Sequence, residues 1–163
     1  MKDLIRKCVK TKEIHVNPSD IRSTIGNAIE EKLKKDMEGV CCDDGYILKN
    51  SIQIIERSVG KIINVNNQSK IKYDIKYSCS VLTPTKETHI DCYINSVTKM
   101  GAVAYIKYEK MTEFQESPLL IIIPKSYSPE AESLELNKKF KIEILATRIK
   151  YRSNQIHVVA KLV

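Results

Sequence analysis

Residues 70–82 read KIKYDIKYSCSVL, and this stretch, together with the Thr83-Pro84-Thr85 that follows it, decides the fold. Apolar and polar residues alternate almost strictly along residues 70–82, as they do in a long strand with one buried face. Proline cannot donate to a strand ladder, so the strand pattern is broken at Pro84. We therefore expect one domain over residues 1–82 and a second over residues 83–163.

The first domain contains one segment that predicts a helix. Residues 19–37 place an apolar residue at every fourth position, which gives an apolar stripe along one face. The stripe consists of Ile21, Ile25, Ile29, Leu33 and Met37. The residues that suit the helix start are Asn17, Pro18, Ser19 and Asp20. Gly39 suits a left-handed stop. The other predicted elements are strands at 14–16, 46–48, 51–56, 60–65 and 70–82, with a turn at 66–69.

Beyond the boundary, five runs predict strands and no long segment predicts a helix. These runs are residues 89–97, 102–108, 119–123, 140–149 and 155–162. Their number matches the five strands of a Greek-key OB barrel. The expected fold class is therefore α+β and mostly β, with a one-helix-plus-antiparallel-sheet domain followed by a five-stranded OB-fold barrel.

Composition excludes several classes of protein. The longest apolar run, at 119–123, has five residues, whereas a membrane-spanning helix needs about 20. The first sixteen residues contain no apolar run of about 7–15 residues, so we expect no secretory signal peptide. The five cysteines form no C-x-x-C pair, and we expect free thiols rather than a zinc site. We expect no metal and no cofactor.

No catalytic constellation stands out in the sequence. None of the three histidines has a Ser, Cys or carboxylate at a recognisable motif spacing. Neither a G-x-x-x-x-G-K nor a G-x-G-x-x-G loop is present. Asp43 and Asp44 are followed by Gly45, which favours an acidic turn over a cation site. We therefore expect a protein without catalytic residues of its own.

The net charge of +7 is unevenly distributed along the chain. Residues 1–82 carry +4, residues 83–137 carry −3, and residues 138–163 carry +6. In the last segment, six cations lie around Tyr151: Lys138, Lys139, Lys141, Arg148, Lys150 and Arg152. Cations beside an aromatic ring on an OB barrel are typical of single-stranded nucleic-acid binding. A solvated, lysine-rich edge hairpin is the alternative, because natural sheets use lysine against aggregation.

A series of short motifs then resembles one known family. They are IHVNPSDI at 14–21, MEGVCCDDGYIL at 37–48, GKI at 60–62, IKY at 75–77 before Pro84, the stretch 84–101, IIP at 122–124, RI at 148–149 and IHV at 156–158. In order and spacing they are similar to the seventh, stalk subunit of RNA polymerase II and to its counterpart in the archaeal polymerase. The resemblance covers nearly the whole chain.

The resemblance implies a non-catalytic subunit of a multisubunit DNA-dependent RNA polymerase. Residues 1–82 would be an RNP-like tip domain that docks on the polymerase core near RNA exit. Residues 83–163 would be an OB barrel of the ribosomal S-one type that contacts nascent single-stranded RNA. The implied partners are polymerase core subunits, a fourth-subunit-like stalk partner and RNA, with no membrane.

Site residues follow from this resemblance and from the charge pattern. The expected docking residues are Glu38, Gly39, Cys41, Gly45, Tyr46, Gly60, Asn66 and Asn67. The expected RNA-binding residues are Lys99, Tyr105, Lys107, Lys138, Lys139, Lys141, Arg148, Lys150, Tyr151 and Arg152. The sequence leaves two roles open for Tyr105, which either replaces the aromatic missing after Gly101 or belongs to the core.

The sequence also departs from the family. Glu87 and Cys92 stand where the family commonly has glycines, and Ala102-Val103 stands where many such barrels have an aromatic. This Lys- and Ile-rich, Gly-poor divergence favours a large DNA virus as the source. The expected location is then the host cytoplasm or virion, or the nucleus if the protein is cellular. Two other functions remain open: a free-standing OB-fold single-stranded RNA-binding protein and a protein-interaction module without RNA contact.

Overall fold

The computed structural model describes residues 1–21 and 24–163. It divides into two compact units. The sheet unit comprises residues 6–38 and 47–81. The barrel unit comprises residues 82–163 together with two earlier segments, residues 1–5 and 39–46. The division into a docking domain and an RNA-binding domain at residues 82/83 stays a prediction about function.

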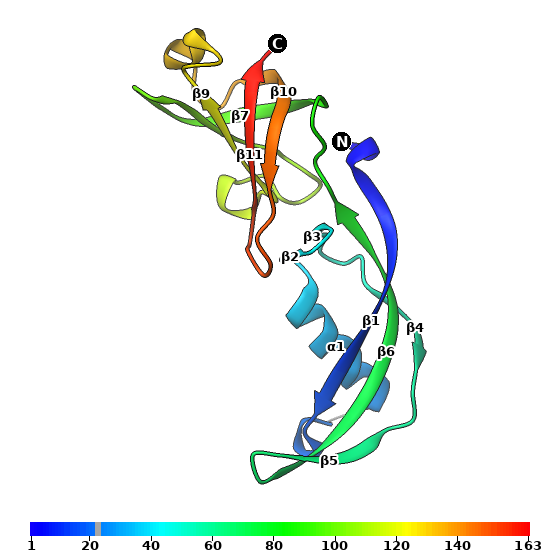
Figure 1. Ribbon diagram of the computed structural model, residues 1–163. Coiled ribbons are helices and arrows are strands. Elements are labelled where there is room, and N and C mark those ends of the chain that lie inside the picture. The colour runs from blue at the N-terminus through cyan, green and yellow to red at the C-terminus, as the bar shows by residue number, and fades with distance from the viewer. Residues whose placement is uncertain (22–23) are drawn as a thin grey trace. The chain divides into compact units, whose positions relative to one another are not determined.

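The N-terminal half is built around one antiparallel ladder (Figure 1). Its strands are β1 (Ile5–Val16), β2 (Cys41–Cys42), β3 (Gly45–Ile47), β4 (Gln53–Arg57), β5 (Lys61–Val65) and β6 (Gln68–Leu82). The order is β1-β6-β3-β2, and β4 and β5 also pair with β6. The predicted alternation is confirmed, because Tyr73, Ile75 and Tyr77 are buried while Asp74 and Lys76 are exposed.

Strand β1 is much longer than the predicted 14–16. Residues 5–13 carry lysines on both faces, so they lack the alternation that marks a half-buried strand. The sheet order places β1 at an edge, where cationic residues protect an open strand from pairing with other chains. An edge strand of this kind therefore lacks the alternation of apolar and polar residues by which a strand is predicted from sequence.

Helix α1 (Ile25–Met37) buries Ile29, Leu33 and Met37. The predicted helix over 19–37 is thus confirmed over its last thirteen residues and wrong at its start. The cap is Thr24, whose hydroxyl accepts a hydrogen bond from the Asn27 N–H at 3.2 Å. Ile25 is exposed in the first turn. Residues 18–20 form a separate 3-10 helix, and residues 22–23, also predicted helical, lie outside the described residues.

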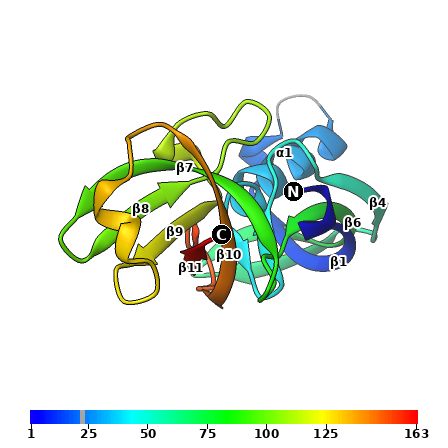
Figure 2. The ribbon, with the colours of Figure 1, turned by 90° about the horizontal axis from the view of Figure 1, so that it is seen from above.

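The C-terminal half is a closed five-stranded barrel. Its strands are β7 (His89–Thr98), β8 (Gly101–Tyr105), β9 (Leu119–Pro124), β10 (Lys139–Arg148) and β11 (Ile156–Leu162). The order around the barrel is β7-β8-β9-β11-β10, and β10 pairs back with β7. Only β9 and β11 are parallel among these pairs. Figure 2 shows β7, β8 and β9 side by side. All five predicted strands are present, and the arrangement is consistent with an OB fold.

The barrel interior is filled by aliphatic side chains. Ile94, Ile121, Ile142, Ile144 and Val158 are completely buried. One glycine is required for closure of the first hairpin. Gly101 has φ +139°, and a Cβ there would lie 2.2 Å from the Ile123 carbonyl oxygen. Only glycine fits this approach of β8 to β9, so the barrel depends on it.

Candidate nucleic-acid interface

The strongest cationic feature is the turn that joins β10 to β11. The Ser153 N–H donates to the Lys150 carbonyl at 3.0 Å, so residues 150–153 form a β-turn. Tyr151 and Arg152 occupy its corners, and Arg152 has φ +62°. Arg148, Lys150, Tyr151 and Arg152 are all exposed, and we call them the hairpin-tip group. The Tyr151 side chain is 57% exposed.

The six predicted cations around Tyr151 fall into two sets. At the start of β10, Lys138 forms an ion pair with Glu135, and Lys139 lies 2.9 Å from an Asp91 carboxylate oxygen. The hydrogen bond to Asp91 also raises the pKa of Lys139 above its ordinary value. The second set comprises Lys141, Arg148, Lys150 and Arg152. None of these four side chains forms an ion pair with a residue that the structure describes. Available positive charge is therefore concentrated toward the hairpin tip.

A small cavity of about 170 Å³ opens beside this turn. It is lined by Arg148, Lys150, Ser153, Gln155 and His157. Arg148 and His157 are direct partners across β10 and β11, so they project from the same face. Ser153 Oγ donates to the Gln155 carbonyl at 2.8 Å. Gln155 Nε2 donates to the Phe114 and Ser117 carbonyls, each at 3.0 Å. The lining thus combines fixed polar groups with cationic ones.

The turn is held from its other side by strand β2. The Cys41 N–H donates to the Ser153 carbonyl, and the Arg152 N–H donates to the Cys41 carbonyl, both at 2.8 Å. These two bonds attach the turn to residues 39–46, which belong to the same barrel unit. Because the backbone on both sides of Arg152 is bonded, the part of the turn that carries this cation is fixed before any ligand arrives.

The remaining predicted RNA-binding residues lie elsewhere on the barrel. Lys99 is exposed in the turn between β7 and β8. The Lys107 ammonium lies 4.3 Å from the centre of the Tyr93 ring. Tyr105 is only 5% exposed and packs against the rings of Tyr93 and Phe114, at centroid distances of 6.0 and 5.9 Å. Of the two roles left open for Tyr105, the structure shows the core role, and its ring faces are covered by protein.

His157 joins the cationic cavity although it is absent from the predicted set. The sequence places it at an alternating position of the last strand, where a surface or packed histidine is the usual interpretation. Its neighbourhood with Arg148 depends on the β10–β11 register, which includes a bulge between Ile144 and Ala146. In the sequence, the only indication that Arg148 and His157 would be strand partners is the short segment between them.

Three of the predicted docking residues are buried. Cys41 and Tyr46 are 1% and 2% exposed, and Gly45 is also buried. Burial, with a smaller effect from Cys42, raises the pKa of the Cys41 thiol to about 11. Burial likewise raises the pKa of Tyr46, with a contribution from Cys41. Within this chain these residues pack the β2–β3 hairpin, so their side chains are not presented on the surface.

Three further docking residues shape the backbone. Glu38 Oε1 accepts a hydrogen bond from the Ile52 N–H at 3.3 Å, directly after α1. Gly39 has φ +74°, as the predicted left-handed helix stop requires. A Cβ on Gly60 would lie 2.8 Å from Ile71 Cγ2, so this position permits close packing on β6.

Asn66 and Asn67 are the exposed members of the docking set. They form the two-residue turn between β5 and β6, where Val65 pairs with Gln68. Their φ angles of +50° and +62° are those of a type I′ hairpin turn, which asparagine tolerates well. The two side chains therefore project from the end of a regular hairpin of the sheet unit.

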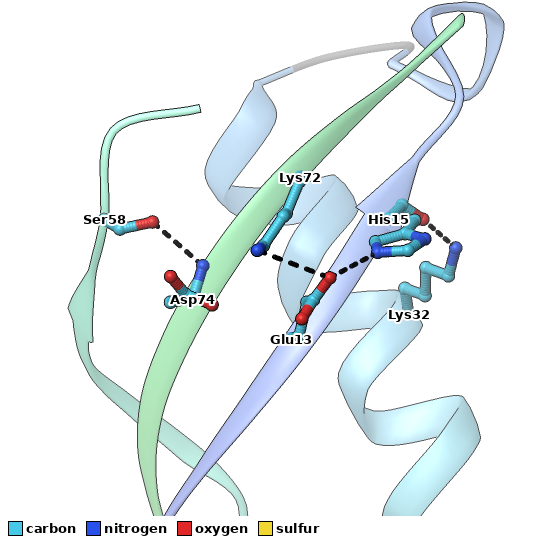
Figure 3. A network of polar contacts seen from close by, with 6 residues as sticks. All are labelled: Glu13, His15, Lys32, Ser58, Lys72 and Asp74. Carbon is cyan, nitrogen blue, oxygen red and sulfur yellow. Dashed lines mark hydrogen bonds and ion pairs between the residues drawn. The ribbon is translucent and has the colours of Figure 1, made fainter. Parts of the chain in front are cut away.

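The sheet unit also contains a polar network that ties three elements together (Figure 3). Glu13 Oε1 lies 2.7 Å from His15 Nε2 and 3.6 Å from Lys72 Nζ, which joins β1 to β6. The hydrogen bond with His15 lowers the pKa of Glu13, and Lys72 adds to this effect. Lys32 on α1 donates to the His15 carbonyl. The Asp74 N–H donates to Ser58 Oγ at 2.8 Å. Lys32 and Lys72 are therefore engaged in contacts within the sheet unit.

The cysteines lie away from any ligating cluster. Cys8 is half-buried, the other four are buried, and all five are free thiols. Burial, with help from Asp91, raises the pKa of Cys92 to about 12, so its thiolate is disfavoured. Among residues 1–21 and 24–163, no group of three His, Cys, Asp or Glu side chains is placed to hold a metal ion.

Helices in the described part of the chain are too short or too polar to cross a lipid bilayer.

Comparison with known proteins identifies two related polymerase subunits, although no protein-family model matches the chain. A protein of Acanthamoeba polyphaga mimivirus, provisionally named DNA-directed RNA polymerase subunit L376, is 21% identical over 165 residues, covering 92% of this chain and 77% of its own. The DNA-directed RNA polymerase II subunit rpb7 of Schizosaccharomyces pombe is 26% identical over 148 residues, covering 83% of this chain and 82% of the yeast protein. The predicted resemblance is confirmed: over most of its length, this chain is similar, at low identity, to a viral RNA polymerase subunit and to the RNA polymerase II subunit rpb7.

Proposed function

We propose that this chain is a non-catalytic stalk subunit of a multisubunit DNA-dependent RNA polymerase. The observation that carries the proposal is its similarity to polymerase subunits across both halves of the chain. A free-standing OB protein would not need the N-terminal half, whereas the similarity to rpb7 covers 83% of this chain. The viral relative also supports a large DNA virus as the source, with the protein in the host cytoplasm or virion.

The barrel is proposed to contact nascent single-stranded RNA as it leaves the polymerase. Support comes from the hairpin-tip group, whose three cations have no ion pair among the described residues. Such cations can bind phosphates, and an exposed ring such as Tyr151 can stack on a base. Lys99 and Lys107 are exposed elsewhere on the same barrel and are proposed as further phosphate contacts.

The N-terminal half is proposed to dock on the polymerase core. The exposed Asn66-Asn67 turn is the part of the docking set able to present side chains to a partner. Glu38, Gly39, Cys41, Gly45, Tyr46 and Gly60 would act by shaping the backbone that carries the docking loops. Turns at the end of a rigid ladder can enter a partner's groove at low conformational cost. A fourth-subunit-like protein would complete the stalk.

The decisive experiment for assembly is purification of the tagged protein from its native source. Large polymerase subunits should co-purify with it in stoichiometric amounts. Replacing Asn66-Asn67 by Asp-Gly keeps the type I′ turn but removes both amides, and should weaken co-purification. The Lys99→Ala change, in a turn of the barrel, is the matched control. Absence of polymerase subunits from the wild-type complex would overturn the proposal in favour of a free-standing RNA-binding protein.

RNA contact is tested separately by binding of single-stranded RNA at several salt concentrations. Neutralising the six cations around Tyr151 should reduce the affinity and flatten its dependence on salt, because fewer counterions are released from phosphates. A wild-type protein that assembles with polymerase but shows no RNA binding would instead be a protein-interaction module.

A further inference from the structure

We propose that the cavity between Arg148 and His157 is a binding site for one phosphate group of the RNA strand. This inference rests on the proposed RNA contact and specifies where on the barrel a phosphate is held. The site differs from a general cationic surface because it is a cavity with a defined set of lining residues.

Charge in the cavity favours an anion. Of the five lining residues, Arg148 and Lys150 are cations, His157 carries an imidazole, and no lining residue is acidic. The cations also lack ion pairs with other described residues, so no internal carboxylate competes for them. The nearest acid on β10, Glu143, is already bound to Lys161 at 2.9 Å. An arginine fork beside a second cation is well suited to phosphate oxygens.

Size favours a phosphate group over a whole nucleotide. The cavity measures about 170 Å³. Pockets that enclose drug-sized ligands measure roughly 300–1,000 Å³, so a base and sugar would not fit inside together with the phosphate. The base next to the bound phosphate would therefore lie outside the cavity, toward the exposed part of the hairpin tip.

Two of the lining residues, Ser153 and Gln155, are held by hydrogen bonds before binding. Gln155 donates to two carbonyls of the β8–β9 connection, and Ser153 bonds to Gln155 within the turn. The Ser153 carbonyl is in turn bonded to Cys41 on β2. Few groups must be ordered when phosphate enters, so little of the binding energy is lost to conformational entropy.

The backbone conformation at Arg152 also supports anion binding at this turn. A left-handed turn position favours glycine or asparagine, and a long side chain there carries a conformational cost. Arg152 occupies that position at φ +62° and adds a cation to the turn whose first and last residues, Lys150 and Ser153, line the cavity.

The first test uses inorganic phosphate and the whole protein. Amide resonances of residues 148–157 should shift on addition of phosphate, and not on addition of chloride at equal ionic strength. Arg148→Gln should weaken phosphate binding at least fivefold, whereas Lys125→Gln, the same charge loss at a barrel lysine that is paired with Glu132, should leave it unchanged. Arg148→Lys should recover part of the loss. His157→Gln provides a second variant in case Arg148→Gln fails to fold.

The second test uses short oligouridine RNAs with a 5′-hydroxyl or a 5′-phosphate. Tighter binding of the 5′-phosphate form, lost in Arg148→Gln, would assign a terminal phosphate to the cavity. Equal binding of both forms with an Arg148-specific loss would assign an internal phosphate. Equal weakening by Arg148→Gln and Lys125→Gln would overturn the cavity and leave the general RNA contact intact. Phosphate-induced shifts without any RNA binding would overturn the RNA contact and leave the cavity.

Discussion

The two ends of strand β10 carry similar numbers of cations, but the cations are held in ion pairs at only one of these ends. At its start, Lys138 and Lys139 are bound to Glu135 and Asp91. At its last residue, Arg148, and in the turn that follows, Lys150 and Arg152 included, no such ion pair is formed with any residue the structure describes. A count of charges along the sequence cannot distinguish the two ends, because the neutralising acids lie outside the segment 138–152.

Backbone conformation shows the same contrast. Each end has one residue in the left-handed region, Asn137 at φ +60° and Arg152 at φ +62°. Asparagine tolerates that region, and Asn137 also donates to the Ile94 carbonyl at 2.8 Å. The Arg152 N–H likewise donates to the Cys41 carbonyl at 2.8 Å, so the two positions differ in side chain: asparagine tolerates the left-handed region and arginine does not favour it. The start of β10 is thus consistent with a role in folding, and the end is consistent with a role in binding.

The largest difference is expected between two triple variants. Replacing Arg148, Lys150 and Arg152 by glutamine should weaken single-stranded RNA binding about 100-fold and lower the salt slope by about 2, at roughly 0.7 per lost phosphate contact. The same change at Lys138, Lys139 and Lys141 should have a much smaller effect, since two of these lysines are already paired. Fluorescence anisotropy across a salt series measures both quantities. Equal losses of RNA affinity in the two triple variants would show that the two ends of β10 do not differ in RNA binding.

A tenfold effect is expected from the aromatic residue of the hairpin tip. Tyr151→Ala should weaken RNA binding about tenfold, near the lower part of the ~1–3 kcal/mol that stacking on a base contributes. Tyr127→Ala is the matched control, because Tyr127 is 62% exposed on the same barrel unit, after β9. Both variants should unfold at the wild-type temperature. If both weaken RNA binding alike, Tyr151 has no special role.

A smaller effect of opposite sign on stability is expected at the two left-handed positions. Arg152→Asn should raise the free energy of unfolding by about 0.5 kcal/mol, since asparagine tolerates this conformation, while weakening RNA binding about threefold. Asn137→Arg should lower the free energy of unfolding by a similar amount. For a chain of this size the corresponding shift in melting temperature is about 1–2 °C, measurable by calorimetry. A fall in stability in Arg152→Asn would show that the arginine stabilises the turn.

The smallest effect comes from making the start of β10 resemble its end. Asp91→Asn removes the partner of Lys139, so the pKa of Lys139 should return toward its ordinary value and the lysine should become available to phosphate. RNA affinity at low salt should rise about twofold. Glu116→Gln, the same charge change at an exposed acid of the barrel unit, controls for net charge. An equal rise in both variants would trace the effect to net charge alone.

Much of the fold is visible in the sequence because it follows from local alternation. The long strand through Tyr73, Ile75 and Tyr77 and all five barrel strands agree with their patterns within a few residues. The errors occur where the pattern is weak. Strand β1 is cationic on both faces, and the start of α1 depends on Thr24, whose capping bond the sequence does not distinguish from those of other polar candidates.

The candidate site is less predictable because its residues meet only through tertiary pairing. The ion pair of Lys138 with Glu135 spans three residues and is readable from sequence, whereas that of Lys139 with Asp91 needs the pairing of β10 with β7. Burial of Tyr105 depends on the positions of Tyr93 and Phe114. The cavity at Arg148 and His157 likewise depends on strand register.

The bonds between Cys41 and the 150–153 turn have a consequence for the order of folding. The β2 segment is synthesised long before its partner, Ser153. Until residues 150–153 leave the ribosome, the N–H and C=O of Cys41 must be satisfied by water, and the barrel lacks strand β11. Closing so long a loop is slow compared with forming a hairpin. The 150–153 turn should therefore reach its native form after the local hairpins of the sheet unit.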